Sequence, residues 1–276
     1  MIAQMKTDLN TSARPVGVDE LRRAWLAVQA GHFRQCAREP QPETSNPSAP
    51  AGVWTPAAGE LVVPVVGASG CCGATTVSLA LATAAGRRAR VVESTSASRS
   101  GLVAASAREL GSENHGWAHG VRDQVLLDRG SGEYPSPDNV PTPPPADSPL
   151  VTVVDVGGQV EQVVAGHGWL TRLLAEAPTV VLVARASVPG LRRLECCLLQ
   201  LDAERTVVTV VGPSVRHWPR LLSHSMGPLT AGRVDSGRLV DIPEDRGLAL
   251  RGLTPDPLPA RLLAHAAALL PLIKGN

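Results

Sequence analysis

The sequence predicts an α/β fold, a doubly wound and mostly parallel sheet preceded by an N-terminal helix on a Pro-rich linker. Two observations predict the sheet. The short apolar run 61–66 has the character of a strand that is buried on both faces, and valine-rich runs such as 206–211 are further strand candidates. Helical segments separate these runs, and such alternation builds a parallel sheet with its ligand site at the carboxyl ends of the strands.

The first predicted element is an amphipathic helix at 19–30, within an N-terminal segment that spans residues 1–38. Leu21 and Trp25 recur at helical spacing on its apolar stripe. Residues 39–59 are rich in proline and small polar residues, which is typical of a linker. A tethered helix of this kind either docks on a partner protein or folds back on its own domain, and the apolar stripe fits both interpretations.

The main domain is expected over residues 60–273. Its predicted strands are 61–66, 89–93, 150–154, 179–184, 206–211 and 239–242. Its predicted helices are 75–85, 169–175, 190–201, 218–225 and 259–270. Part of 106–128 is expected to be helical, and a short strand is expected at Arg233. Prolines gather in 128–149, which is predicted to be a disordered surface insertion.

The composition excludes several classes of protein. The chain has 276 residues, and 26 basic against 25 acidic residues leave a net charge of +1, which excludes a protein that binds DNA over its whole surface. One Phe and one Tyr exclude an aromatic platform for single-stranded nucleic acid. No apolar stretch is long enough to span a membrane and no signal-peptide core is present, so a cytoplasmic location is expected.

The segment 65–76 (VVGASGCCGATT) carries the most chemical information. A glycine-rich turn between a strand and a helix directs backbone N–H groups into one concavity, and the helix dipole adds positive potential there. Both features suit a phosphate group. Thr75 stands where a loop hydroxyl reaches a Mg²⁺ ion. The predicted phosphate-binding residues are Gly70, Cys71, Cys72, Gly73, Ala74, Thr75 and Thr76.

At this loop the sequence resembles the ParA/MinD family of P-loop ATPases. The residues that match the family's loop are Gly70, Gly73, Thr75 and Thr76. In the same alignment the loop-opening glycine of the family falls on Ala68, its signature lysine on Ser69 and its P-loop lysine on Ala74. The resemblance therefore implies a P-loop NTPase-like domain that lacks both lysines.

Other segments extend the resemblance over 60–273. The Walker B strand of the family ends in an aspartate before a short Pro/Gly loop, and 151–158 (VTVVDVGG) matches it with Asp155 but without the proline. Glu93 stands where the family's second strand ends in an aspartate, and 240–245 looks like the loop that closes over adenine. The resemblance implies ATP and Mg²⁺ as ligands, with Thr75 and Asp155 holding the metal, and a homodimer.

The missing lysines limit the chemistry. A P-loop lysine contacts the β- and γ-phosphates, and losing such a contact typically costs ~10²-fold or more in rate. Lys6 and Lys274 are the only lysines of the chain. One hypothesis is a degenerate ParA/MinD-like scaffold or positioning factor that binds nucleotide weakly and does not hydrolyse it, in plasmid partition, conjugation or secretion. The alternative is an active ATPase in which an arginine, Arg99 or one from a partner, replaces the lysine.

Other candidates have simpler interpretations. The adjacent cysteine pairs, Cys71–Cys72 and Cys196–Cys197, do not have the spacing of zinc ligands. They are expected to be small buried thiols, and the second pair is expected to lie on a helix. Trp117 and His119 are expected in a solvated loop. The arginines at 185, 192 and 193 are expected on a solvated helix face rather than in a patch for nonspecific DNA. The final helix, 259–270, is expected to pack on the domain, because a helix that lies on a membrane surface needs a charged face.

Overall fold

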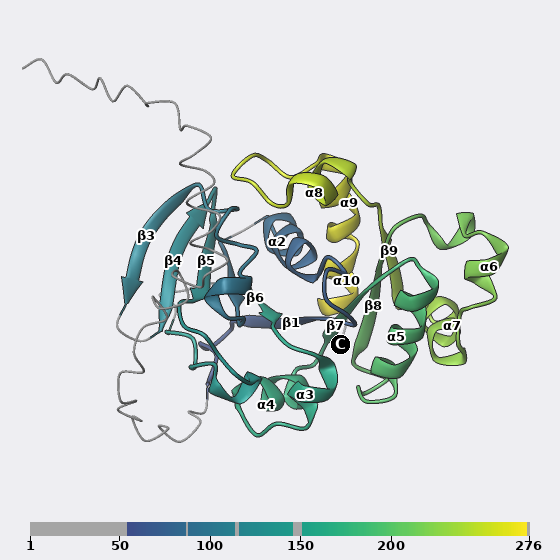
Figure 1. The fold of residues 1–276 in the computed structure, drawn as a ribbon, viewed down its shortest axis with the longest axis horizontal. Helices are drawn as coiled ribbons and strands as arrows, with labels where there is room; N and C mark the ends of the chain where they lie inside the picture. The colour runs from purple at the N-terminus through teal and green to yellow at the C-terminus, as the bar shows by residue number, and fades with distance from the viewer. Residues whose placement is uncertain (1–53, 87, 114–115, 146–150, 275–276) are drawn as a thin grey trace, which may run out of the picture. The chain divides into compact units, whose positions relative to one another are not determined.

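The computed structural model describes residues 54–86, 88–113, 116–145 and 151–274, all within the compact unit Ala49–Asn276 (Figure 1). The predicted helix at 19–30 lies outside the described residues, as does the predicted linker up to residue 53. Trp54 at the end of that linker packs edge-on against Trp169, with ring centroids 5.4 Å apart. Among the described residues, no helix combines the length and apolar character needed to cross a membrane.

A single nine-stranded sheet forms the centre of the described domain, in the order β3-β4-β5-β2-β6-β1-β7-β8-β9. The strands are β1 (Leu61–Gly67), β2 (Ala89–Glu93), β3 (Arg108–Glu113), β4 (Trp117–Arg122), β5 (Val125–Gly130), β6 (Val151–Val156), β7 (Val180–Arg185), β8 (Thr206–Val211) and β9 (Leu239–Ile242). Neighbours from β5 to β9 are parallel, whereas β3-β4 and β4-β5 are antiparallel. The predicted mostly parallel sheet is confirmed.

Helices cover both faces of this sheet (Figure 1). One face carries α2 (Ala74–Ala84), α8 (Arg246–Arg251), α9 (Ala260–Ala267) and α10 (Leu269–Lys274). The other carries α3 (Val160–Val164), α4 (Trp169–Glu176) and α5 (Val188–Leu198), with α6 (Arg220–Ser223) and α7 (Pro228–Asp235) beyond them. Each face has its own apolar cluster. The predicted packing of the last helix is confirmed, because Leu262, Ala266 and Leu269 are buried in the cluster that contains α2.

The predicted strand at Arg233 is wrong, because this residue lies in α7. The start of α7 is fixed from α5, where the Glu195 carboxylate accepts hydrogen bonds from the backbone N–H of Leu229 (2.7 Å) and Thr230 (3.0 Å). Pro228 occupies the first helical position, where the missing N–H costs nothing. A carboxylate at a helix N-terminus and a proline at its first position both stabilise helix over strand at this point.

The predicted helix within 106–128 is also wrong, because β3, β4 and most of β5 occupy this segment. Arg122 pairs with Val125, so the chain reverses through two residues, the first of which, Asp123, has a φ of 51°. This left-handed conformation is costly in a helix and common in tight hairpin turns. Trp117 is fully buried and His119 lies on β4, so the expected solvated loop is wrong at both positions.

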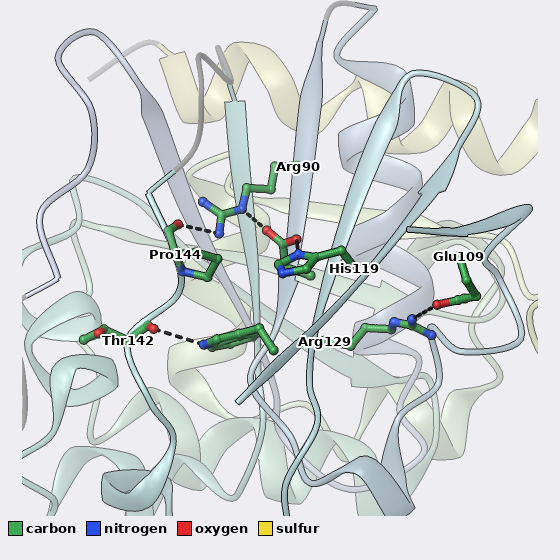
Figure 2. Close-up of polar contacts among 8 residues, drawn as sticks. Arg90, Glu109, His119, Arg129, Thr142 and Pro144 are labelled. Atoms are coloured by element: carbon green, nitrogen blue, oxygen red, sulfur yellow. Dashed lines mark hydrogen bonds and ion pairs between the residues drawn. The ribbon is translucent and has the colours of Figure 1, made fainter. Parts of the chain in front are cut away.

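A buried polar network holds these strands against β2 (Figure 2). Arg90 on β2 forms an ion pair with Asp128 on β5 and donates a hydrogen bond to the Pro144 carbonyl at 2.8 Å. His119 Nδ1 lies 2.6 Å from the other Asp128 oxygen. Trp117 Nε1 donates to the carbonyl of Thr142 at 3.0 Å. These contacts give the Arg90 guanidinium, the Asp128 carboxylate and the Trp117 indole N–H polar partners, which offsets their desolvation.

The same contacts correct the prediction of a disordered insertion over 128–149. Residues 128–145 form the end of β5 and an ordered connection with a 3₁₀ turn at Pro137–Asn139, while 146–149 lie outside the described residues. Val140 is buried in the apolar cluster of its face, and its carbonyl accepts a hydrogen bond from Trp169 Nε1 at 3.0 Å. The prolines thus lie in a connection that is anchored by two tryptophan side chains, Trp117 and Trp169.

Candidate functional site

The phosphate-loop candidate is the turn between β1 and α2. Cys71 has a φ of 56°, and Gly73, the N-cap of α2, has a φ of 98°. A side chain on Gly67 would lie 2.8 Å from the Cys72 sulfur, so the loop passes too close for a Cβ there. The turn therefore closes tightly around the buried Cys72 thiol, whose pKa is raised by burial.

The N-terminus of α2 opens toward this turn. The first hydrogen bond within the helix runs from the Val77 N–H to the Gly73 carbonyl at 2.9 Å. The N–H groups of the helical residues before Val77 therefore have no helix carbonyl to which they can donate. No side chain caps this end, and its first turn holds no acidic residue. Free amides and the positive end of the helix dipole favour an anion at this position.

Asp155 lies beside this helix at the carboxyl end of β6. The Ser78 hydroxyl on α2 donates a hydrogen bond to its Oδ1 at 3.3 Å, and the Thr75 hydroxyl lies near enough to lower the pKa of Asp155. The register of the sheet places Asp155 opposite Val65 on β1, two residues before the last residue of that strand. The two predicted metal-binding residues, Thr75 and Asp155, thus lie near each other beside the start of α2.

Glu93 is the second buried carboxylate of the site. It pairs in register with Asp155 on one side and with Arg129 on the other. It accepts hydrogen bonds from the Ser100 hydroxyl and from the Gly101 N–H at 2.8 Å. Burial raises the pKa of Glu93. Burial, followed by the charge of Glu93, raises the pKa of Asp155 to about 7.

Asp155, Thr75 and the two neighbours of Glu93, Ser100 and Gly101, line a cavity of about 710 Å³ at the carboxyl edge of the sheet. This volume lies within the range of roughly 300–1,000 Å³ that is typical of small-molecule sites. Among the described residues, the cationic side chains on its wall are Arg99, Arg185 and Arg251, and none of its lining residues is a lysine. Arg185 forms an ion pair with Glu244. The positive charge of the cavity wall is therefore carried by arginines from outside the glycine-rich turn.

The cavity has an apolar region on the other side of β1 from Asp155. Its wall there includes Val211 at the end of β8, Ile242 at the end of β9, and Leu248 on α8. Asp245 caps α8 by accepting the Leu248 N–H at 2.8 Å, which fixes this helix over the cavity. One region is therefore rich in backbone amides, as a phosphate chain requires. The other offers apolar surface to a flat base, together with the charged side chains of Arg185, Glu244 and Arg251.

A Mg²⁺–nucleotide fits these residues. The loop residues predicted from the sequence all line the cavity, and so does Asp155; they are Gly70, Cys71, Cys72, Gly73, Ala74, Thr75 and Thr76. The Thr75 hydroxyl and the Asp155 carboxylate, which line the same cavity, supply the hard oxygen ligands that Mg²⁺ prefers. Asp155 is 6% exposed, and its raised pKa reflects a negative charge that is poorly compensated, which a bound cation would correct. No cluster of three or more His, Cys, Asp or Glu side chains that suits a metal was found in the described part of the chain.

The residues that sequence reasoning misses come from distant segments. Ser100 and Gly101 are not marked by any motif, although a loop that follows the end of β2 is a position where a binding edge is expected. The expectation of a solvated helix face is wrong for Arg185, because it is the last residue of β7 and lines the cavity. Arg251 and Leu248 carry no local sequence signal, because only the tertiary packing of α8 brings them to the cavity.

Comparison with known proteins finds similarity among solved structures. The chain is similar to the septum site-determining protein MinD of Pyrococcus horikoshii, solved with Mg-ADP (16% identity, TM-score 0.46, 76% of this chain and 96% of that one). It is similar to a ParA family ATPase of Chlorobium tepidum (13% identity, TM-score 0.46, 77% of this chain and 93% of that one). It is also similar to a plasmid partition protein of Borrelia burgdorferi bound to AMPPNP (11% identity, TM-score 0.48, 78% of this chain and 98% of that one). No protein-family model and no curated protein sequence matches the chain.

Proposed function

We propose that the chain is a degenerate ParA/MinD-like protein that binds a nucleoside triphosphate, ATP in the first instance, with Mg²⁺ in this cavity. The observation that carries the proposal is that Thr75 and Asp155 line the same cavity beside the uncapped N-terminal amides of α2. A phosphate chain accepts hydrogen bonds from these amides, and Mg²⁺, when bound, offsets its negative charge.

We expect hydrolysis at this site to be slow or absent, because the loop lacks the cation that stabilises charge on the transferring phosphoryl group. Ala74 and Ser69 stand at the two lysine positions of the family and both line the cavity. The backbone amides bind ground state and transition state alike, so they support affinity more than rate. We therefore assign the chain a role as a scaffold or positioning factor whose state depends on bound nucleotide.

The setting of this role is part of the proposal. Plasmid partition, conjugation or secretion in the cytoplasm is the context that the resemblance suggests, with a homodimer as the assembled form and an unidentified protein partner for the N-terminal helix. Nonspecific DNA is not favoured as a partner, because Arg185 and Arg193 are engaged in ion pairs with Glu244 and Glu161.

A second candidate is an active ATPase that uses Arg99 in place of the lysine. The observation that favours it is the position of Arg99, which is exposed, lines the cavity and directly precedes Ser100 and Gly101. A Cβ on Gly101 would lie 3.2 Å from the Thr75 side chain, so this segment passes close to the predicted metal ligands. The Arg99 guanidinium donates a hydrogen bond to Ser96 Oγ at 3.2 Å and would have to release it to reach a phosphate.

Calorimetric titration of ATP into the full chain, with and without Mg²⁺, tests the proposed binding. We expect Mg²⁺-dependent binding that Thr75→Val weakens by tenfold or more. We expect Ala74→Lys, which restores a cation to the loop, to tighten ATP binding by about tenfold to a hundredfold, since one charge-assisted contact contributes roughly 1.5–3 kcal/mol. Absence of heat at millimolar ATP would overturn the proposal, and binding that Thr75→Val leaves unchanged would place the nucleotide elsewhere.

A further inference from the structure

Arg193 on α5 connects two segments that lie on different elements. Its Nε donates to the carbonyl of Ala68 at 3.1 Å, immediately after β1. Its Nη1 and Nη2 each lie 2.8 Å from a carboxylate oxygen of Glu161, in the first turn of α3. The guanidinium therefore makes a two-pronged ion pair with one element and a hydrogen bond to the backbone of another. Arg193 itself does not line the cavity.

The two connected segments form adjoining parts of the cavity wall. Ala68 directly precedes Ser69, and Glu161 lies two residues after Gln159, and both Ser69 and Gln159 line the cavity. The second segment runs from Asp155 to Glu161. In Figure 1, α3 and α5 lie on the same face of the sheet, which allows one side chain to reach both segments from outside the cavity.

The Ala68 carbonyl is held firmly from this side. Besides Arg193 Nε, the Cys197 sulfur lies 3.8 Å from the same oxygen, and the Ala68 N–H donates to the Val183 carbonyl at 2.8 Å. The segment after Asp155 is held from the end of β2 and by its own helix, because the Gly157 N–H donates to Ser94 Oγ at 3.1 Å and Val160 and Val163 of α3 are fully buried. The Glu161–Arg193 ion pair adds the contact that connects this segment directly to the start of the turn after β1.

We propose that Arg193 is a positioning residue that makes the site selective for a nucleoside triphosphate over a diphosphate. This inference rests on the proposed function. In a loop without lysine, the terminal phosphate depends on backbone groups from both segments, and those groups are useful only when the segments are held in place beforehand. A diphosphate is held by the amides of α2 and does not need the segment after Asp155. The ion pair therefore contributes to triphosphate affinity and much less to diphosphate affinity.

The test measures dissociation constants of fluorescent ATP and ADP analogues, with Mg²⁺, for the full chain and for matched variants. We expect Arg193→Gln and Glu161→Gln each to weaken ATP binding about three- to fivefold, since the pair is partly exposed, and ADP binding less than twofold. Because both variants break the same ion pair, the double variant should bind ATP no more weakly than the weaker-binding single variant. Arg192→Gln is the control, because Arg192 is exposed and forms no ion pair within the described residues.

The outcomes separate this inference from the function on which it rests. Native protein that binds neither analogue overturns both. Native protein that binds ATP while Arg193→Gln loses affinity for ATP and ADP equally, or loses none, overturns the positioning role alone. Thermal unfolding of the ligand-free variants provides the second readout, since an equal loss for both nucleotides together with a lowered midpoint identifies a contact that only stabilises the fold.

Discussion

Glu93 and Asp155 lie directly opposite each other on the neighbouring strands β2 and β6, both buried, with relative exposures of 1% and 6%. Two carboxylates in register at a buried strand end repel each other when both are charged. Glu93 has Ser100, the Gly101 amide and the nearby Arg129 to stabilise its charge, whereas the charge of Asp155 is favoured only by the hydroxyls of Thr75 and Ser78. With the pKa of Asp155 raised to about 7, the pair is expected to hold a proton below that pH, which a bound cation could replace.

This arrangement predicts how stability depends on pH. The pKa of Asp155 is raised from an ordinary value of 3.8 to about 7. Between these values the unfolded chain releases a proton that the folded chain keeps, so the free energy of unfolding falls as pH rises through this window and stays low above it. Asp155→Asn removes this loss of unfolding free energy at high pH, because asparagine carries no titrating carboxyl. We expect the variant to be more stable at pH 8, by on the order of 2–4 kcal/mol.

Urea unfolding of both proteins at pH 5 and pH 8 checks this prediction. The difference between native chain and Asp155→Asn should be larger at pH 8. A difference that is the same at both pH values would show that Asp155 does not keep its proton in the folded state.

The glycines of the phosphate loop provide a matched pair of substitutions. Gly73 has a φ of 98°, and we expect Gly73→Ala to cost about 1–2 kcal/mol of stability because the left-handed conformation is unfavourable for a side chain. At Gly70 the φ is not positive and a Cβ would meet no atom within 4 Å, so Gly70→Ala should cost less than about 0.5 kcal/mol. Thermal unfolding measures both variants, and equal midpoints would contradict the left-handed N-cap.

The buried ion pair beneath the antiparallel strands gives a prediction that does not involve the cavity (Figure 2). Asp128→Asn leaves the Arg90 charge buried without a counter-ion, and we expect it to cost about 3–5 kcal/mol. Glu244→Gln breaks the exposed pair with Arg185 and should cost less than about 1 kcal/mol. Denaturant unfolding of the two variants distinguishes the environments, and similar losses would indicate that Arg90 is reached by water.

Much of the parallel sheet could be predicted from the sequence, because its strands are apolar on both faces and need no partner information. The run 206–211 is an example, since all but its last residue are buried. The strands β3 and β4 could not be identified in this way, because β3 (RELGSE) is mostly polar, β4 (WAHGVR) has no regular alternation, and they contain Gly111 and Gly120. The turn at Asp123 was the available signal for these two strands, but its polar residues resemble those on the exposed face of a helix.

The candidate site was predictable to the extent that it is local in sequence. The turn from Gly70 to Thr76 is contiguous, and Asp155 ends an apolar strand, so both could be recognised and both line the cavity. The contacts of Arg193 with Ala68 and Glu161 join residues that are distant in sequence. Such contacts depend on how α5 packs beside α3, and no periodicity or motif in the sequence encodes that packing.

Phosphate release from Mg²⁺-ATP is the measurement that tests the central claim most directly, a nucleotide site without efficient hydrolysis. The native chain should release phosphate no faster than Asp155→Ala, even when binding is saturated. Turnover by the native chain that Asp155→Ala abolishes would contradict the claim and would favour an ATPase that uses an arginine, with Arg99→Gln as the variant that identifies it.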